Sequence, residues 1–304
     1  MFLVTDVLVL GLRALTFVAL FQAAGTVIFL RIFERDLGVG VAERCRNLAR
    51  LAAVVALTAA VLHFVLTPAR MAGDLAETFD PSLGSLLLRS TSGSAHVVRV
   101  VGLALLLLSL DRASRLNNAV ALLGATLALA SFALMGHTAI HPQRWVLAVL
   151  LLVHLGVGAL WFGALLPLRW AVSDEAADRA GAIVARFSAL AVNLVPLILV
   201  CGAVMSVVLV RSLAELATGY GAVLLSKTGV FAVLMGLAAL NKWRFGPRLG
   251  GGDPAATAAL RHTVAIEWLL IAALLIGTAV GTSLFSPEHL EGAFGPEHEA
   301  PPAH

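Results

Sequence analysis

Long apolar runs separated by short polar connections make up most of this chain. A helix that crosses the hydrocarbon core of a bilayer needs about 20 mostly apolar residues. Eight stretches meet that requirement, and they predict an all-α, polytopic membrane bundle of about eight transmembrane helices. The expected spans are 7–30, 47–68, 94–110, 116–136, 144–168, 186–210, 223–242 and 263–284.

The connections between these runs are too short to hold a soluble domain. The longest, 69–93, contains the acidic residues Asp74, Glu77 and Asp80 and then the apolar run 83–88, which predicts a helix on the outer surface. The third span is short and is extended upstream to Ser90. We therefore expect a single integral membrane domain over 1–285, followed by a disordered tail over 286–304, which contains Pro, Glu and His.

The basic residues are distributed unevenly between alternate connections. Fourteen Lys and Arg residues fall in the connections after the first, third, fifth and seventh spans, and five fall in the others. Cytoplasmic loops of membrane proteins carry the excess of positive charge. The distribution predicts that the basic loops face the cytoplasm and that both termini lie outside.

The composition agrees with a membrane protein and excludes several other classes. Hydrophobic residues make up 60% of the chain and charged residues 13%, with a mean hydropathy of +0.94. Soluble domains carry about a quarter charged residues, so a soluble enzyme, a nucleic-acid-binding domain and a disordered protein are excluded. No phosphate-binding, nucleophile-elbow, zinc-protease or dinucleotide motif is present, which predicts that the protein is not an enzyme.

A short internal echo suggests two related halves. Residues 25–31 (GTVIFLR) and 163–169 (GALLPLR) share a Gly, five intervening residues and a final Arg on the same side of the membrane. The echo predicts two four-helix units of the same orientation, 1–129 and 130–285, as in transporters built from parallel repeats.

Histidines are concentrated toward the outer face of the predicted bundle. Imidazole is a common ligand for copper and zinc. His154 stands out, because it lies ten residues past Arg144, about 15 Å deep in a Leu- and Val-rich helix. A single interfacial His, such as His63 or His96, is equally well explained by a hydrogen bond to a loop carbonyl or a lipid headgroup. The other outer histidines are His137, His141, His289, His298 and His304, and His262 is cytoplasmic.

Sulfur-containing residues join this outer region. Met135 precedes His137 by two residues, and Cys201 and Met205 lie one turn apart on one helix face. Thioether and thiolate donors favour Cu(I), although a buried Cys also acts as a small apolar side chain. If the fourth span continues as a helix past Gly136, His137 and His141 share a face, and His154 would converge on them.

Two polar residues lie near the cytoplasmic ends of the last two spans. Glu267 is inside the eighth span, and Asn241 closes the seventh beside Lys242. Ionisable residues in a span are costly and often mark ion pathways. The pattern predicts either a structural Glu–Lys ion pair or the inner end of a cation path through Glu267 and Asn241.

An ordered set of short motifs resembles the bacterial copper resistance protein D family (CopD/PcoD), most strongly over 130–285. Lys242 departs from the Asn-Arg usual in the family but keeps the charge. The motifs are Gly136-His137, His154, Trp161-Phe162-Gly163, Arg186-Phe187-Ser188, Leu224-Leu225-Ser226-Lys227, Asn241-Lys242 and Glu267.

The resemblance implies a multi-pass protein of the bacterial inner membrane that moves copper from the periplasm toward the cytoplasm. It implies His137 and His154 as metal-site residues, and a separate periplasmic copper-binding partner of the CopC type. Geometry adds His141, Met135 and Met205 as ligands, with Glu267, Asn241 and Cys201 along the path. The alternatives are a b-haem electron carrier, because His63, His96, His137 and His154 lie on four consecutive helices, and a non-transporting accessory protein of copper resistance.

Overall fold

The computed structural model describes residues 2–110, 114–136, 141–209 and 219–284, with side chains for all of these except 2–3, 209, 219–224 and 284. The described chain is helical and contains no strand, which confirms the all-α prediction. The predicted tail, 286–304, lies outside the described residues. The long helices are α1 (Phe2–Phe33), α2 (Val39–Ala72), α4 (Thr91–Ser109), α5 (Arg115–Ala130), α7 (Arg144–Asp174), α8 (Ala177–Leu209), α9 (Gly219–Leu240) and α11 (Pro254–Leu284).

Each of the eight predicted spans coincides with one of these long helices. Seven of them, all except α9, are long and apolar enough to cross a membrane over their described residues. The predicted span 223–242 falls on α9, which has 22 residues. The chain is therefore a polytopic membrane bundle. The shorter elements are η1 (Leu75–Phe79), α3 (Pro81–Arg89), η2 (Ser131–Leu134), the π-helical turn η4 (Asn241–Phe245) and α10 (Gly246–Leu249).

Several helices begin well before the apolar run that predicts them. α2 begins at Val39, α8 at Ala177 and α11 at Pro254, each eight or nine residues ahead of the predicted span. Hydropathy reports where a helix enters hydrocarbon, whereas helical hydrogen bonding continues into the aqueous phase wherever the backbone allows it. All three extensions lie on the side with the basic loops.

The outer connection between α2 and α4 folds into the short elements η1 and α3. The Asp80 carboxylate caps α3 by accepting hydrogen bonds from the backbone N–H groups of Ser82 and Leu83, both at 2.8 Å. The Ser82 hydroxyl also donates to it, and these bonds lower the pKa of Asp80 below its ordinary value of 3.8. Ser90 caps α4 through Gly93 N–H, which agrees with the predicted upstream start.

The end of α5 differs from the expectation of a helix that continues past Gly136. The α-helix stops at Ala130 and tightens into η2, after which Met135 is extended, with a φ of −125° and a ψ of 156°. Gly136 then adopts a left-handed φ of 71°. Such a conformation ends a helix, and glycine adopts it without steric cost. The helix of α5 therefore does not continue through Gly136, and the condition on which a shared helical face for His137 and His141 depended is not met. His137 itself lies outside the described residues.

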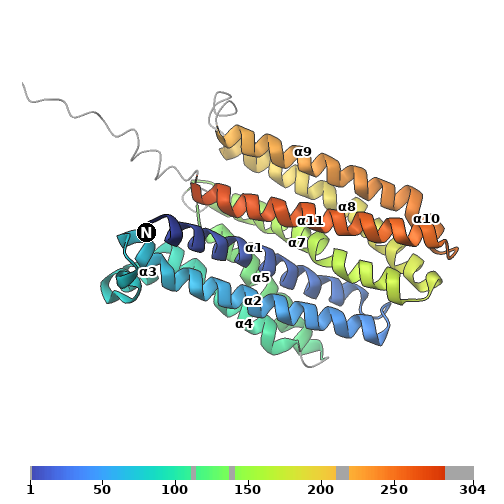
Figure 1. Cartoon of the computed structure of the whole chain (residues 1–304), viewed down its shortest axis with the longest axis horizontal. Coiled ribbons are helices and arrows are strands. Elements are labelled where there is room, and N and C mark those ends of the chain that lie inside the picture. Colours follow the sequence, from blue (N-terminus) through green and yellow to red (C-terminus); the bar gives the residue numbers. More distant parts are fainter. Residues whose placement is uncertain (1, 111–113, 137–140, 210–218, 285–304) are drawn as a thin grey trace, which may run out of the picture.

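The helices are arranged side by side, with α1, α7 and α11 in the middle of the bundle (Figure 1). α8 and α9 lie on one side of this central group, and α2, α4 and α5 on the other. The start of α1 and the end of α11 lie at the same end of the bundle, which also carries α3. This arrangement agrees with an even number of crossings.

The two glycines of the internal echo contact each other where α1 crosses α7. A Cβ atom added to Gly25 would stand 1.7 Å from the Ala159 carbonyl oxygen, and one added to Gly163 would stand 2.3 Å from the Gly25 carbonyl carbon. Such close backbone approach is typical of membrane helix pairs with small residues. Buried Gln22 and Thr26 on α1 both donate hydrogen bonds to the Gly163 carbonyl.

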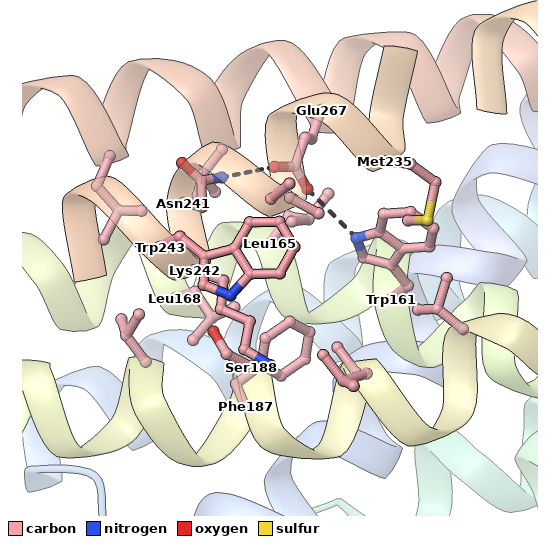
Figure 2. Close-up of a pocket in the computed structure, with 18 of the residues that line it drawn as sticks. Trp161, Leu165, Leu168, Phe187, Ser188, Met235, Asn241, Lys242, Trp243 and Glu267 are labelled. Carbon is pink, nitrogen blue, oxygen red and sulfur yellow. Dashed lines mark hydrogen bonds between the residues drawn. The ribbon is translucent and has the colours of Figure 1, made fainter. Parts of the chain in front are cut away.

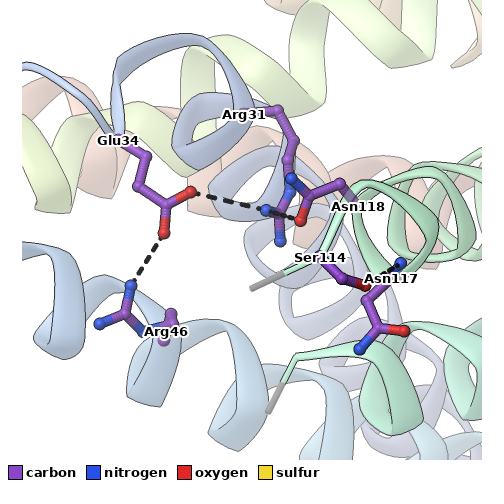
Figure 3. Close-up of polar contacts among 6 residues, drawn as sticks. All are labelled: Arg31, Glu34, Arg46, Ser114, Asn117 and Asn118. Carbon is purple, nitrogen blue, oxygen red and sulfur yellow. Dashed lines mark hydrogen bonds and ion pairs between the residues drawn. The ribbon is translucent and has the colours of Figure 1, made fainter. Parts of the chain in front are cut away.

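Polar contacts join the helices at the end of the bundle that carries the basic loops, which is the predicted cytoplasmic end. Asp36 and Asp174 each follow an echo glycine by eleven residues. Asp36 pairs with Arg186 on α8, and Asp174 pairs with Arg44 on α2. Each ion pair thus joins the two predicted halves, although the four-plus-four organisation itself stays a prediction. Figure 3 shows further contacts at this end, where Arg31 on α1 bonds to Asn118 on α5 and pairs with Glu34, which also pairs with Arg46 on α2.

Candidate functional site

His154 lies on α7 and faces α8. Its Nδ1 atom is 3.0 Å from the backbone carbonyl oxygen of Ile198. Because a carbonyl oxygen can only accept, Nδ1 carries the proton and Nε2 of the neutral ring keeps a free lone pair. Metal-binding histidines are commonly held in this way, with the second ring nitrogen donating to a carbonyl. Gly202 of α8 lies beside the ring, because a Cβ there would make an ordinary van der Waals contact of 3.5 Å with the imidazole Cε1.

Cys201 and Met205 lie on α8, further toward the outer face. Both are buried, and both pack with Leu147 of α7 in a small cluster. The structure therefore brings the two sulfur side chains together on one helix face, as the sequence predicts. The other neighbours of this cluster, Leu150, Leu151 and Val208, are apolar as well.

A cavity of about 320 Å³ opens in the half of the bundle that carries the basic loops, between α7, α8, α9, η4 and α11 (Figure 2). Most of its wall is apolar. Two charged side chains line it, Glu267 from α11 and Lys242 from η4. Trp161 and Leu165 from α7, Val195 from α8 and Met235 from α9 form part of the apolar wall.

Glu267 is a buried carboxyl group held by neutral donors. Only 2% of the residue is exposed. The Asn241 amide donates to Oε1 at 2.6 Å, and the Trp161 indole N–H donates to Oε2 at 3.3 Å (Figure 2). The Thr263 hydroxyl donates to the Asn241 Oδ1 at 2.5 Å and so orients the amide toward the carboxyl group. Lys242 forms no ion pair with Glu267 in the described structure, so the predicted Glu–Lys pair is wrong.

The π-helical turn η4 positions Asn241. It interrupts the helix directly after α9, and Asn241 is its first residue. Single π-helical turns within α-helices are uncommon and are frequently found at functional sites. Here the turn directs a buried amide from the end of α9 toward α11.

His154 and the cavity share one face of α7. Trp161 and Leu165 follow His154 by seven and eleven residues, a spacing that places all three on the same side of a helix. His154 therefore lies about 10 Å outward of Trp161 along the helix axis. The α7–α8 face carries an imidazole in its outer half and a cavity containing a carboxyl group in its inner half.

Comparisons with known proteins agree with these features. The model of the copper resistance protein D-like N-terminal domain matches residues 4–143, and the model of copper resistance protein D matches residues 181–281. The chain belongs to the copper resistance protein D family. The copper transport protein CutJ of Bacillus subtilis (strain 168) is 28% identical over 292 residues, which cover 90% of this chain and 52% of CutJ.

This copper resistance protein D family member spans about half the length of that curated relative. No solved structure matches the chain significantly. The names of the family and of the relative refer to copper resistance and copper transport and not to an enzymatic reaction. Family membership and the long apolar helices together establish a copper-related, multi-pass membrane protein.

His141 and His154, two of the predicted ligands, lie in separate places. His141 is half-buried just before α7, and its Nδ1 accepts a hydrogen bond from the Gln143 N–H at 3.1 Å. The ten residues from Arg144 to His154 place the latter about 15 Å further along the helix, too far for His141 and His154 to bind one ion. Among the residues that the structure describes, no group of three or more His, Cys, Asp or Glu side chains is arranged to hold a metal.

Met135 lies beside a positive charge. Its sulfur is 3.8 Å from the Arg99 Nη2. A copper cation would be repelled by this guanidinium, which disfavours Met135 as a ligand.

Two residues of the Glu267 site were not predicted as site residues from the sequence. Trp161 appeared there only as part of a family motif, and Thr263 did not appear at all. A buried indole N–H usually finds a hydrogen-bond acceptor. The presence of Trp161 and Glu267 in two membrane helices was therefore the available clue to the hydrogen bond between them. Thr263 lies one turn before Glu267 and resembles any other helical Thr, because its bond to Asn241 depends on how α9 and α11 pack.

Proposed function

We propose that this protein carries copper across the bacterial inner membrane, from the periplasm toward the cytoplasm, along the α7–α8 face. The observation that carries the proposal is the alignment of His154, whose Nε2 is free, with the cavity that contains Glu267 two helical turns below. Copper is the cargo. His137 and His141 are its first contacts at the outer mouth, and a separate periplasmic protein of the CopC type delivers it.

Each group on this face suits one stage of passage. The His154 imidazole offers one lone pair, so it binds copper without enclosing it, and transport requires sites that both load and release. Cys201 and Met205, which follow on α8 toward the outer face, offer soft sulfur donors near His154. In the cavity, Glu267 has neutral donors and no ion-pair partner, so its carboxylate attracts a passing cation in a low-dielectric setting. Asn241 holds that carboxylate in place, and Lys242 lies at the same cavity.

Copper uptake into proteoliposomes tests the proposal. Wild type is compared with His154→Ala and Glu267→Gln, and we expect each variant to lose roughly tenfold or more of the uptake rate, as for the loss of groups that orient or bind a metal. The matched controls are His262→Ala and Glu43→Gln, which alter exposed residues near the cytoplasmic ends of α11 and α2. If His154→Ala or Glu267→Gln took up copper as fast as its control, the proposed path along the α7–α8 face would be contradicted.

The absorption spectrum of the purified protein separates this proposal from the b-haem alternative. We expect bound copper and no Soret band. A Soret band that disappears in His154→Ala would assign the histidine to haem, and the absence of both signals would favour an accessory role.

A further inference from the structure

Five basic side chains meet in the outer half of α1, α2 and α4, away from the α7–α8 face. We name them the outer basic cluster: Arg13, His63, Arg70, His96 and Arg99. His63 lies within electrostatic range of all the other four, and Arg13 lies within range of both other arginines. Two of the five, Arg13 and Arg99, are guanidinium groups inside the predicted membrane spans, where charges are rare and expensive.

Arg99 is the most deeply placed member. The residue is 8% exposed. Its Nε donates to the Ser131 hydroxyl at 3.1 Å, its Nη2 contacts the Met135 sulfur at 3.8 Å, and its guanidinium lies 4.8 Å from the centre of the Phe132 ring. A guanidinium has five N–H donors, and the partners of this one are a hydroxyl, a weak thioether acceptor and a ring face.

Arg13 contacts a second phenylalanine that packs against Phe132. The Arg13 guanidinium is 5.9 Å from the centre of the Phe17 ring, and the Phe17 ring packs edge-on against the Phe132 ring, with 4.5 Å between their centres. Its Nη2 donates to the Thr282 hydroxyl of α11 at 2.9 Å. The two guanidiniums therefore flank one pair of phenylalanines, and both reach partners without charge.

One described carboxylate pairs with a member of this cluster. The Asp6 carboxylate accepts a hydrogen bond from the Arg70 Nε at 2.9 Å and neutralises that arginine. Neither Arg13 nor Arg99 forms an ion pair within the described part of the chain. Two buried or half-buried positive charges thus remain without a negative partner, although charges inside a membrane protein are normally paired.

Both side chains are directed toward the outer surface. α1 and α4 begin at the outer end of the bundle, and side chains on a helix tilt toward its N-terminus. Arg99 is eight residues into α4, about 12 Å along the axis, and its long side chain shortens the remaining distance to the outer leaflet.

We propose that Arg13 and Arg99 form a binding site for a phosphate-type anion, supplied either by the headgroup of an anionic lipid of the outer leaflet or by a free anion. The planar guanidinium fork matches phosphate oxygens. The imidazoles of His63 and His96, the latter stacked on Phe64 at 4.2 Å, border the site. This inference does not rest on copper transport, because none of its residues lies on the α7–α8 face.

Native mass spectrometry of delipidated protein tests the site with two probes, phosphatidylglycerol and inorganic phosphate. Wild type is compared with the double variant Arg13→Gln/Arg99→Gln. We expect the double variant to bind the probe about tenfold more weakly or worse, since charge-assisted hydrogen bonds are lost. A difference seen with phosphatidylglycerol alone assigns the site to the lipid headgroup, and a difference seen with inorganic phosphate as well assigns it to a free anion.

Two controls address charge and folding. Asp6→Asn/Arg70→Gln removes a charge pair from the same region without changing the net charge, and Arg89→Gln removes one exposed charge from α3. Both should bind the probes like wild type. If the double variant does not fold, Arg13→Gln alone, at a half-buried position, replaces it in the comparison. The proposal would be overturned if the double variant, or Arg13→Gln in its place, bound both probes as tightly as wild type does.

Discussion

The contact between α1 and α7 makes Gly163 one of the least replaceable positions in the protein. In Gly163→Ala the new Cβ would lie 2.3 Å from the Gly25 carbonyl carbon and 2.4 Å from the Thr26 nitrogen. Ordinary contacts of such atoms begin at about 3.4 Å, so the two backbones must separate by about 1 Å. This separation also lengthens the hydrogen bonds that Gln22 and Thr26 donate to the Gly163 carbonyl, which are already 3.3 and 3.1 Å long.

We expect Gly163→Ala to lower the free energy of unfolding by about 3 kcal/mol. Overpacking a close contact costs roughly 1–3 kcal/mol, and two weakened interhelical hydrogen bonds add about 0.6 kcal/mol each. At about 2.1 cal/mol/K of unfolding entropy per residue, a loss of about 3 kcal/mol in a chain of 304 residues corresponds to a fall of roughly 5 °C in the melting temperature. Thermal unfolding in detergent, followed by circular dichroism, measures it.

Gly156→Ala is the matched control on the same helix. A Cβ there would meet no atom within 4 Å, and Ala favours a helix over Gly by up to about 1 kcal/mol, so its melting temperature should be unchanged or higher. If Gly163→Ala melted within about 2 °C of Gly156→Ala, the close approach of α1 and α7 would be refuted.

Three further predictions concern single contacts. Trp161→Phe removes a donor from the buried Glu267 carboxyl group, so thermal unfolding should show a loss of about 1–3 kcal/mol, accompanied by slower copper uptake. The lowered pKa of Asp80 means that its carboxylate stabilises α3 at neutral pH and that this contribution is lost only as the pH falls below 3.8. Hydrogen exchange in α3 should therefore be faster in Asp80→Ala than in wild type at pH 7, and the difference should shrink as the pH is lowered below 3.8. Asp36→Asn should lower the melting temperature by less than about 4 °C, because its pair with Arg186 is half exposed, and a larger fall would show that this pair holds the bundle together.

The membrane helices could be predicted from the sequence because their main constraint is local. A span must supply enough apolar residues to cross hydrocarbon and must satisfy its own backbone hydrogen bonds. The apolar run 144–168 therefore predicted the start of α7 at Arg144, and Ser90 marked the start of α4. The early start of α8 at Ala177 carried no such signal, because Asp178 and Arg179 tolerate a helix in water as readily as a loop.

The composition of the candidate site was partly visible, but its connections were not. A His and a Glu inside apolar helices are conspicuous, so His154 and Glu267 could be named from the sequence. Their partners depend on how different helices pack against one another. The Ile198 carbonyl belongs to a different helix from His154, and Trp161 and Asn241 approach Glu267 from two further helices.

The condition for a shared face of the outer histidines is not met at one backbone position. His137 and His141 would share a helical face only if the helix of the apolar run 116–136 continued past Gly136. The left-handed φ of 71° at Gly136 and the extended Met135 break that helix. Glycine is compatible with both outcomes, since it is permissive in conformation, and only the fold decides between them.

The hydrogen bonds that hold His154 and those that hold Glu267 differ in how readily a mutation can remove them. The Ile198 group that orients His154 is a main-chain carbonyl, so nearly any side chain at position 198 can change without altering the orientation of the imidazole. Glu267 is held by the side chains of Trp161 and Asn241, each of which a single substitution can eliminate. A library of random variants selected for activity should therefore accept many residues at position 198 and few at 161 and 241, a contrast that deep mutational sequencing would display directly.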